Sequence, residues 1–129
     1  MKKTDMTVWL RRLGLLALAV LAASCVGCDD DDDDFDRVPP AGQGSLVVDN
    51  NTGDRVRVFI DGSQVPSVGK YDDRYYDLNP GSYRIALDGD DTDRFWTGEV
   101  DILQSRVTVL DVTDDLGDFD DFDVDIDYQ

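Results

Sequence analysis

The sequence contains no histidine and only two cysteines, which excludes most familiar catalytic and metal centres. Without histidine there is no Ser-His-Asp or Cys-His nucleophile system, and the commonest ligand of transition metals is missing. Cys25 and Cys28 lie close together near the amino terminus, so they form neither a disulfide framework nor a metal set. Carboxylate pairs remain as acid–base groups, but the aspartates fall in expected turns and on exposed strand faces. We therefore expect no enzyme and no cofactor.

Basic residues are also scarce. Lysine and arginine total 12 against 29 acidic residues, and the formal net charge is −17. Glu99 is the one acidic residue that is not aspartate. Such a chain repels nucleic-acid phosphates and anionic lipid surfaces, so we expect no nucleic-acid partner. It would instead attract cations or basic proteins.

No apolar run is long enough to cross a bilayer, which needs roughly 20 residues. The longest run, from Leu13 to Ala23, follows the basic residues Lys2, Lys3, Arg11 and Arg12. A basic flank, a short apolar run and small residues after it are typical of a secretion signal. Three alternatives stay open: an uncleaved anchor, a plain cleaved signal, and an export signal of the twin-arginine type.

The run ends in Leu21-Ala22-Ala23-Ser24-Cys25, which resembles the lipobox of bacterial lipoproteins. The resemblance implies cleavage before the cysteine, lipidation of its thiol, and attachment to a membrane through the lipid. We favour Cys25, which directly follows the apolar run, and keep Cys28 as the alternative. Cys25 is followed by Val26, which implies the outer membrane, whereas Cys28 is followed by Asp29, which resembles an inner-membrane retention signal.

Four segments follow from these observations. Residues 1–24 are the expected lipoprotein signal peptide, 25–44 the lipidated cysteine and a tether, 45–113 a β domain, and 114–129 an acidic tail. The unbroken aspartate run Asp29–Asp34, which Phe35-Asp36 extends, cannot bury surface, so we expect disorder there. The proline and glycine residues between Arg37 and Gly44 favour linker conformations, so we expect the whole tether to be a disordered linker. We interpret it as a spacer, with calcium binding as the alternative.

Short stretches of alternating apolar residues, separated by turn signals, fill the predicted β domain. They predict about seven strands and no helix, and hence an all-β fold, a small antiparallel β-sandwich. Asp61-Gly62 is a hairpin signal and Asn79-Pro80-Gly81 a turn. The predicted strands are residues 46–48, 55–61, 63–65, 74–78, 82–88, 94–102 and 106–112. The predicted core residues are Phe59, Tyr83, Ile85, Leu87, Trp96, Val100, Val107 and Val109.

Three stretches of this domain resemble bacterial PEGA-type domains and related surface β-sandwich domains. They are Val58-Phe59-Ile60-Asp61-Gly62, Leu78-Asn79-Pro80-Gly81-Ser82-Tyr83-Arg84-Ile85 and Trp96-Thr97-Gly98-Glu99-Val100. The resemblance implies an extracytoplasmic scaffold or adhesion module and not an enzyme.

The acidic tail alternates from Asp121 to Tyr128 between aspartate and apolar residues. An extended chain would carry Phe122, Val124, Ile126 and Tyr128 on one face and the aspartates on the other. We favour a disordered tail. The alternative is a segment that pairs with a sheet edge or with a basic partner.

Two features suggest ligands. Asp88, Asp90, Asp91 and Asp93 form the best local calcium candidate, although their spacing is not that of an EF-hand and a polar hairpin loop is the simpler interpretation. Five aromatic residues could stack on a glycan or lie in the core: Tyr71, Tyr75, Tyr76, Phe95 and Trp96. The sequence thus predicts a lipid-anchored cell-envelope module that is structural or binds an envelope protein, with a calcium- or glycan-binding surface lipoprotein as the alternative.

Overall fold

Eight β-strands form the regular structure of residues 35–129, which are the residues that the computed structural model describes. The signal segment, both cysteines and the aspartate run lie outside the described residues. Within residues 35–129, no helix is long and apolar enough to span a membrane. In chain order the strands are β1 (Gly44–Asn50), β2 (Val56–Ile60), β3 (Ser63–Val68), β4 (Asp72–Leu78), β5 (Gly81–Gly89), β6 (Phe95–Ile102), β7 (Val107–Asp114) and β8 (Phe122–Tyr128).

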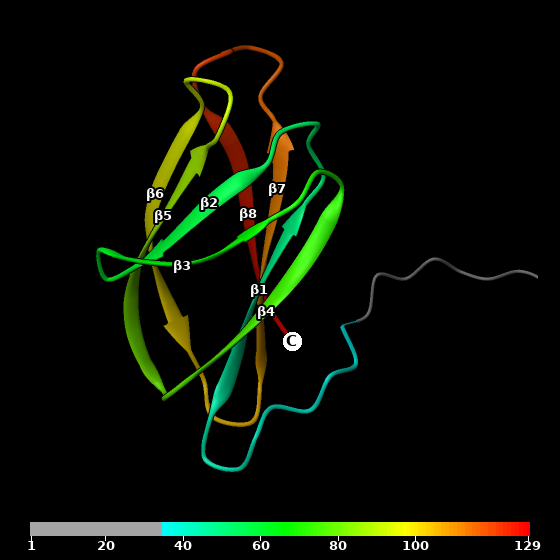
Figure 1. The fold of residues 1–129 in the computed structure, drawn as a ribbon. Helices are drawn as coiled ribbons and strands as arrows, with labels where there is room; N and C mark the ends of the chain where they lie inside the picture. The colour runs from blue at the N-terminus through cyan, green and yellow to red at the C-terminus, as the bar shows by residue number, and fades with distance from the viewer. Residues whose placement is uncertain (1–34) are drawn as a thin grey trace, which may run out of the picture. The chain divides into compact units, whose positions relative to one another are not determined.

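The strands form two four-stranded sheets that face each other (Figure 1). Sheet A has the order β4-β1-β7-β8 and sheet B the order β3-β2-β5-β6. This confirms the predicted all-β sandwich, and each of the seven predicted strands is present. The Asp61-Gly62 hairpin is also confirmed, because both residues have positive φ, 50° and 82°, as a type I′ turn requires.

One strand pair departs from the predicted antiparallel arrangement. β1 and β7 are parallel, with Val47 opposite Val109. They start at the same end because the turn after β6 lies beside the start of β1, where the Ser45 amide donates to the Arg106 carbonyl at 3.0 Å. A Cβ added at Gly44 would lie 2.3 Å from the Leu103 carbonyl oxygen, so this close approach requires glycine.

The core lies between the sheets and follows the alternation of the strands. Val56, Val58 and Ile60 of β2 point inward, while Phe59 lies on the opposite side and is only partly buried. The prediction that Phe59 is a core residue was therefore wrong. The core consists of Leu46, Val48, Val56, Val58, Ile60, Val68, Tyr76, Ile85, Leu87, Val100, Ile102, Leu110, Val112 and Phe122.

The other predicted core residues divide into three groups. Ile85, Leu87 and Val100 are fully buried between the sheets, as expected. Tyr83 and Trp96 are partly buried and pack against the edge of the core. Val107 and Val109 are buried, but they belong to a separate cluster on the other face of sheet A.

The acidic tail is not disordered, so that prediction was wrong. Its second half is β8, which pairs antiparallel with β7 along its whole length, from Phe122 opposite Asp114 to Tyr128 opposite Thr108. Phe122 is 3% exposed and belongs to the core. The alternation explains the result, because it directs one apolar row inward and leaves the aspartates in water. The folded domain therefore extends well beyond the predicted boundary at Thr113.

The end of the predicted tether is also ordered. Phe35 and Arg37 contact sheet A, and the Gln43 amide donates to the Pro40 carbonyl at 3.0 Å. The prediction of a disordered linker was therefore wrong for residues 35–43, because the Phe35 ring packs against apolar side chains of sheet A.

We predict that Phe122→Ala destabilises the domain by about 3–5 kcal/mol, the usual cost of removing a buried phenylalanine ring. The measurement is urea unfolding of the wild type and the variant. Phe119→Ala is the matched control, because Phe119 is 76% exposed, and it should change stability by less than about 0.5 kcal/mol. Equal effects of the two substitutions would contradict the placement of β8 in the core.

We also predict that Tyr76 makes stability depend on alkaline pH. Burial raises the pKa of Tyr76 to about 12, and its hydroxyl donates to the Pro66 carbonyl. In the unfolded chain the phenol ionises near pH 10. The stabilisation is therefore complete below about pH 10 and is lost as the pH rises through 12. Unfolding followed between pH 8 and 12 should show a steeper decline for the wild type than for Tyr76→Phe.

Candidate interaction face on sheet A

The outer face of sheet A carries the most distinctive set of side chains in the described part of the chain. Tyr76, Leu46, Leu110 and Ile126 point toward sheet B, so their neighbours along each strand point outward. One half of this outer face is apolar and the other half is acidic. The sheet positions both halves, because the register of four paired strands fixes which side chains lie next to one another.

The apolar half consists of Val47, Val107 and Val109, which we call the outer valine cluster. These side chains are 0%, 5% and 4% exposed although they point away from the main core. Phe35 and Tyr75 pack against them and account for their burial. Phe35, from the irregular segment that precedes β1, and Tyr75 of β4 thus cover a second, smaller hydrophobic cluster.

The residues that cover the valine cluster are held by several weak contacts. The rings of Phe35 and Tyr75 meet edge to face, with centroids 6.0 Å apart. The Arg37 guanidinium lies 4.9 Å from the centre of the Tyr75 ring and 2.6 Å from a carboxylate oxygen of Asp77. Burial, and next the carboxylate of Asp73, raise the pKa of Tyr75, while Arg37 lowers it. The phenol is consequently neutral at physiological pH.

The acidic half contains a row of four aspartates that runs straight across sheet A. Asp73 of β4 pairs with Asp49 of β1, Asp49 with Asp111 of β7, and Asp111 with Asp125 of β8. We call this set the aspartate row. The Asn51 side-chain amide donates to Asp49 at 3.1 Å and to Asp111 at 2.8 Å. Asp123 and Asp127 of β8 lie on the same face.

Like charges at directly opposed positions of a sheet are destabilising. The aspartate row therefore creates a surface that favours a positively charged group in front of it. It is not a preformed metal cage, because residues 35–129 contain no group of three or more carboxylate, cysteine or histidine side chains arranged to hold a metal ion. The row could not be predicted from the sequence, because its members come from four strands and only the sheet register brings them together.

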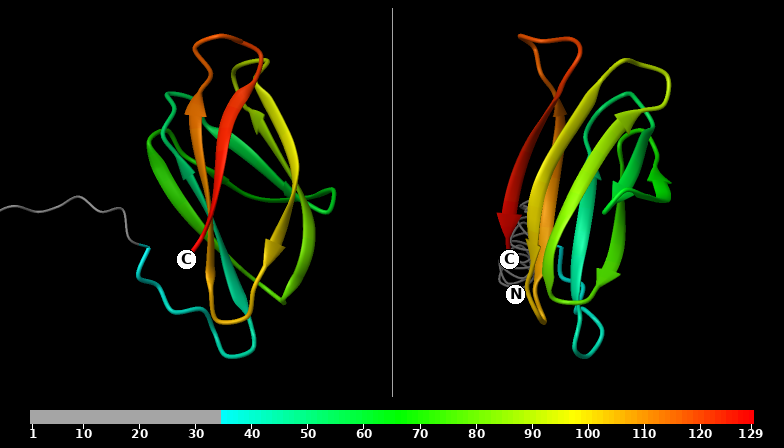
Figure 2. Two further views of the ribbon diagram at one scale, coloured as in Figure 1. Left: turned by 180° about the vertical axis from the view of Figure 1, so that it is seen from behind. Right: turned by 90° about the vertical axis from the view of Figure 1, so that its left-hand side faces the viewer.

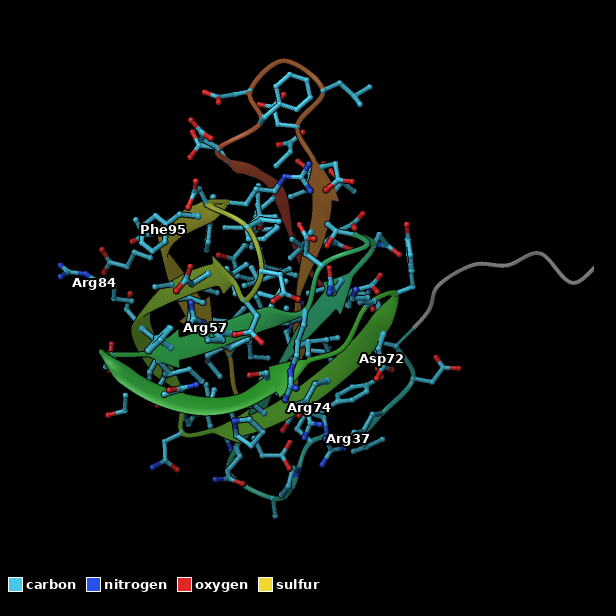
Figure 3. All side chains as sticks on the ribbon, turned by 45° about the horizontal axis from the view of Figure 1, so that its top comes forward. Arg37, Arg57, Asp72, Arg74, Arg84 and Phe95 are labelled. Atoms are coloured by element: carbon cyan, nitrogen blue, oxygen red, sulfur yellow. The ribbon has the colours of Figure 1, made fainter. Side chains whose placement is uncertain are left out.

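Two of the four predicted calcium residues contact an arginine. Asp88 forms an ion pair with Arg57 at 2.7 Å, and Asp90 approaches the same guanidinium at 3.7 Å. Asp91 and Asp93 are exposed in the loop between β5 and β6. Arg57, which is labelled in Figure 3, belongs to β2, the neighbour of β5 in sheet B. The arrangement fits the simpler interpretation of this segment as a polar hairpin loop.

The predicted glycan-stacking aromatics do not form one surface. Tyr76 is in the core, Trp96 packs against its edge, and Tyr75 covers the outer valine cluster. Tyr71 and Phe95 are 74% and 44% exposed, but Tyr71 lies before β4 in sheet A and Phe95 begins β6 in sheet B. Of the five predicted aromatic residues, the two exposed ones could therefore each stack on a sugar ring only singly.

A shallow hollow of about 440 Å³ lies at the outside of sheet B, lined by Asp61, Gly62, Ser82, Arg84 and Glu99. The Ser82 hydroxyl donates to Glu99 at 2.8 Å, and the Arg84 amide donates to Asp61 at 2.9 Å. Arg84 itself projects away from the sheet in Figure 3. The hollow is open and polar, and its two carboxylates accept hydrogen bonds from the Ser82 hydroxyl and the Arg84 backbone amide.

Comparisons with known proteins identify the fold. No protein-family model matches the chain, and no curated protein matches it. Among solved structures, the N-terminal domain of AlgF from P. aeruginosa is similar, with a TM-score of 0.51 and 13% sequence identity. The match covers 70% of this chain and 96% of that chain. At this identity the likeness extends to the β fold alone.

We predict that neutralising the outer end of the aspartate row stabilises the domain. Asp125→Asn removes a charge directly opposite Asp111 and should raise the free energy of unfolding by about 0.2–1 kcal/mol at low salt. The gain should shrink in 0.5 M NaCl, because salt screens exposed charges. Asp93→Asn, which removes an equal charge from a loop, is the control. A loss of stability in Asp125→Asn would contradict repulsion within the row.

Proposed function

We propose that this protein is a lipid-anchored module of the bacterial cell envelope that binds a basic protein partner through the outer face of sheet A. The lipid is attached at Cys25, with Cys28 as the alternative, and holds the domain at the outer membrane. The role is structural or adaptor-like and does not involve catalysis. The resemblance to PEGA-type surface domains supports the same kind of role.

The aspartate row is the observation that carries the interaction part of the proposal. Four carboxylates at directly paired positions cost stability in the isolated domain. Positive charges on a partner would relieve the repulsion between these carboxylates. Complementary charge also speeds the association of two proteins and discriminates against wrong partners. Asp123 and Asp127 lie on the same face and extend the negatively charged surface along β8.

The lipid anchor rests on the sequence. A basic flank, a short apolar run and small residues before Cys25 form a lipobox-like signal. A lipid anchor and a small β domain without histidine fit a non-catalytic envelope protein. The likeness to the AlgF N-terminal domain is compatible with this assignment through its fold.

The calcium and glycan alternatives receive less support. Asp88 and Asp90 are paired with Arg57, which supplies the positive charge that a calcium ion would bring. The aromatic side chains predicted for stacking are divided between the core, the outer valine cluster and two separate exposed positions.

We predict that the mature protein begins at an acylated Cys25. Intact mass of the protein purified from membranes should match a chain that starts at this residue and carries lipid. Cys25→Ser should keep the signal segment and lack the mass of the lipid. Cys28→Ser is the matched control and should be processed like the wild type.

The reverse behaviour of these two variants would assign the lipid to Cys28. A wild-type product that retains Met1, or one that partitions into buffer without detergent, would overturn the anchor.

A further inference from the structure

The free edge of β8 has hydrogen-bonding groups that point away from sheet A. The amide of Gln129 donates to Val107 and the amide of Val107 donates to Gln129, so this pair exchanges both hydrogen bonds. In an antiparallel ladder such pairs alternate with pairs that exchange none. Asp123, Asp125 and Asp127 therefore bond to β7, whereas the backbone groups of Val124, Ile126 and Tyr128 face outward.

The side chains of β8 become steadily less covered along the strand. Phe122 is 3% exposed, but Ile126 and Tyr128, which point to the same inner side, are 37% and 44% exposed. An inward-facing apolar row that remains open to water is unusual for a strand of a sandwich. On the opposite side of the strand stand Asp123, Asp125 and Asp127, all exposed.

The neighbouring sheet closes this edge only at its beginning. The Phe95 amide of β6 donates to the Asp120 carbonyl at 3.0 Å, and Phe95 forms an isolated parallel bridge with Asp121. From that end β8 and β6 separate, as Figure 2 (left) shows. Within residues 35–129, the pairings of Val124 to Tyr128 are those with β7.

Charge determines what kind of strand fits this edge. A second copy of β8 would place its aspartates beside Asp123, Asp125 and Asp127, and like charges at adjacent positions oppose pairing. A strand with lysine or arginine on that side would instead meet opposite charge. Apolar residues on its other side would cover Ile126 and Tyr128.

We propose that the free edge of β8 accepts an extended segment of a partner protein in which basic and apolar residues alternate. The segment adds a fifth strand to sheet A by backbone hydrogen bonding to Val124, Ile126 and Tyr128. Its basic side chains lie beside the β8 aspartates and the end of the aspartate row. This inference rests on the proposed function and specifies how the partner is bound.

The test uses a capped synthetic peptide of alternating lysine and valine, titrated into the protein with its acidic C-terminal strand intact. Two control peptides are matched in length: one carries the same residues in separate lysine and valine blocks, and one replaces each lysine by glutamate. We expect the alternating peptide to bind most tightly. On binding, the amides of Val124, Ile126 and Tyr128 should become protected from hydrogen exchange.

Two pairs of variants separate edge pairing from simple charge attraction. Ile126→Pro removes an outward-facing amide and leaves the ladder with β7 intact, whereas Ile126→Ala removes the side chain and keeps the amide. The proline variant should bind at least about fivefold more weakly than the alanine variant, as expected for one lost hydrogen bond. Circular dichroism and urea unfolding confirm that both variants fold.

The second pair compares Asp125→Asn/Asp127→Asn with Asp91→Asn/Asp93→Asn. The β8 double variant should bind the peptide more weakly and with less dependence on salt. The loop double variant loses the same charge and should show neither effect. Binding without protection of the three amides, or equal binding of the alternating and block peptides, would overturn the edge inference and leave the acidic face as the interaction site. Failure of every basic peptide to bind would overturn both the edge inference and the partner proposed for sheet A, while the lipid anchor stands on its own test.

Discussion

The structure depends on the burial of one strand pair on both of its faces. β1 and β7 lie at the centre of sheet A, and Leu46, Val47 and Val48 are all fully buried. The main core covers one face of the pair, and Phe35 and Tyr75 cover the outer valine cluster on the other. Parallel strands are usually buried on both faces and are rich in branched apolar residues, as this pair is. The exposed aspartates of sheet A are tolerated because this central pair is so well covered.

Local pattern was sufficient to predict most of the fold. Val56, Val58 and Ile60 alternate with Arg57 and Phe59, and this alternation places the strand and its inner face. Asp61-Gly62 adopts the two positive φ values that its hairpin needs. These features depend on residues close together in sequence, so the sequence alone contains enough information about them.

The features that the sequence analysis missed depend on distant residues. Nothing near Val47 indicates that β7 lies beside it in parallel, or that a phenylalanine before the first strand covers both. The aspartate row likewise combines residues from four strands. For the tail, the alternation from Asp121 to Tyr128 favours a strand with one apolar face, whereas repulsion among its aspartates favours disorder. The burial of Phe122 decides between the two, because a deeply buried ring offsets several exposed carboxylates.

The contacts of Phe35 and Arg37 with sheet A bear on the proposed lipid anchor. A fully extended chain spans at most about 3.3–3.6 Å per residue. If Cys25 carries the proposed lipid, the chain from Cys25 could reach at most about 35 Å to Phe35, against about 65 Å to the start of β1 at Gly44. Release of the phenylalanine and arginine from sheet A would nearly double the distance at which the domain can meet a partner, and would at the same moment uncover the outer valine cluster.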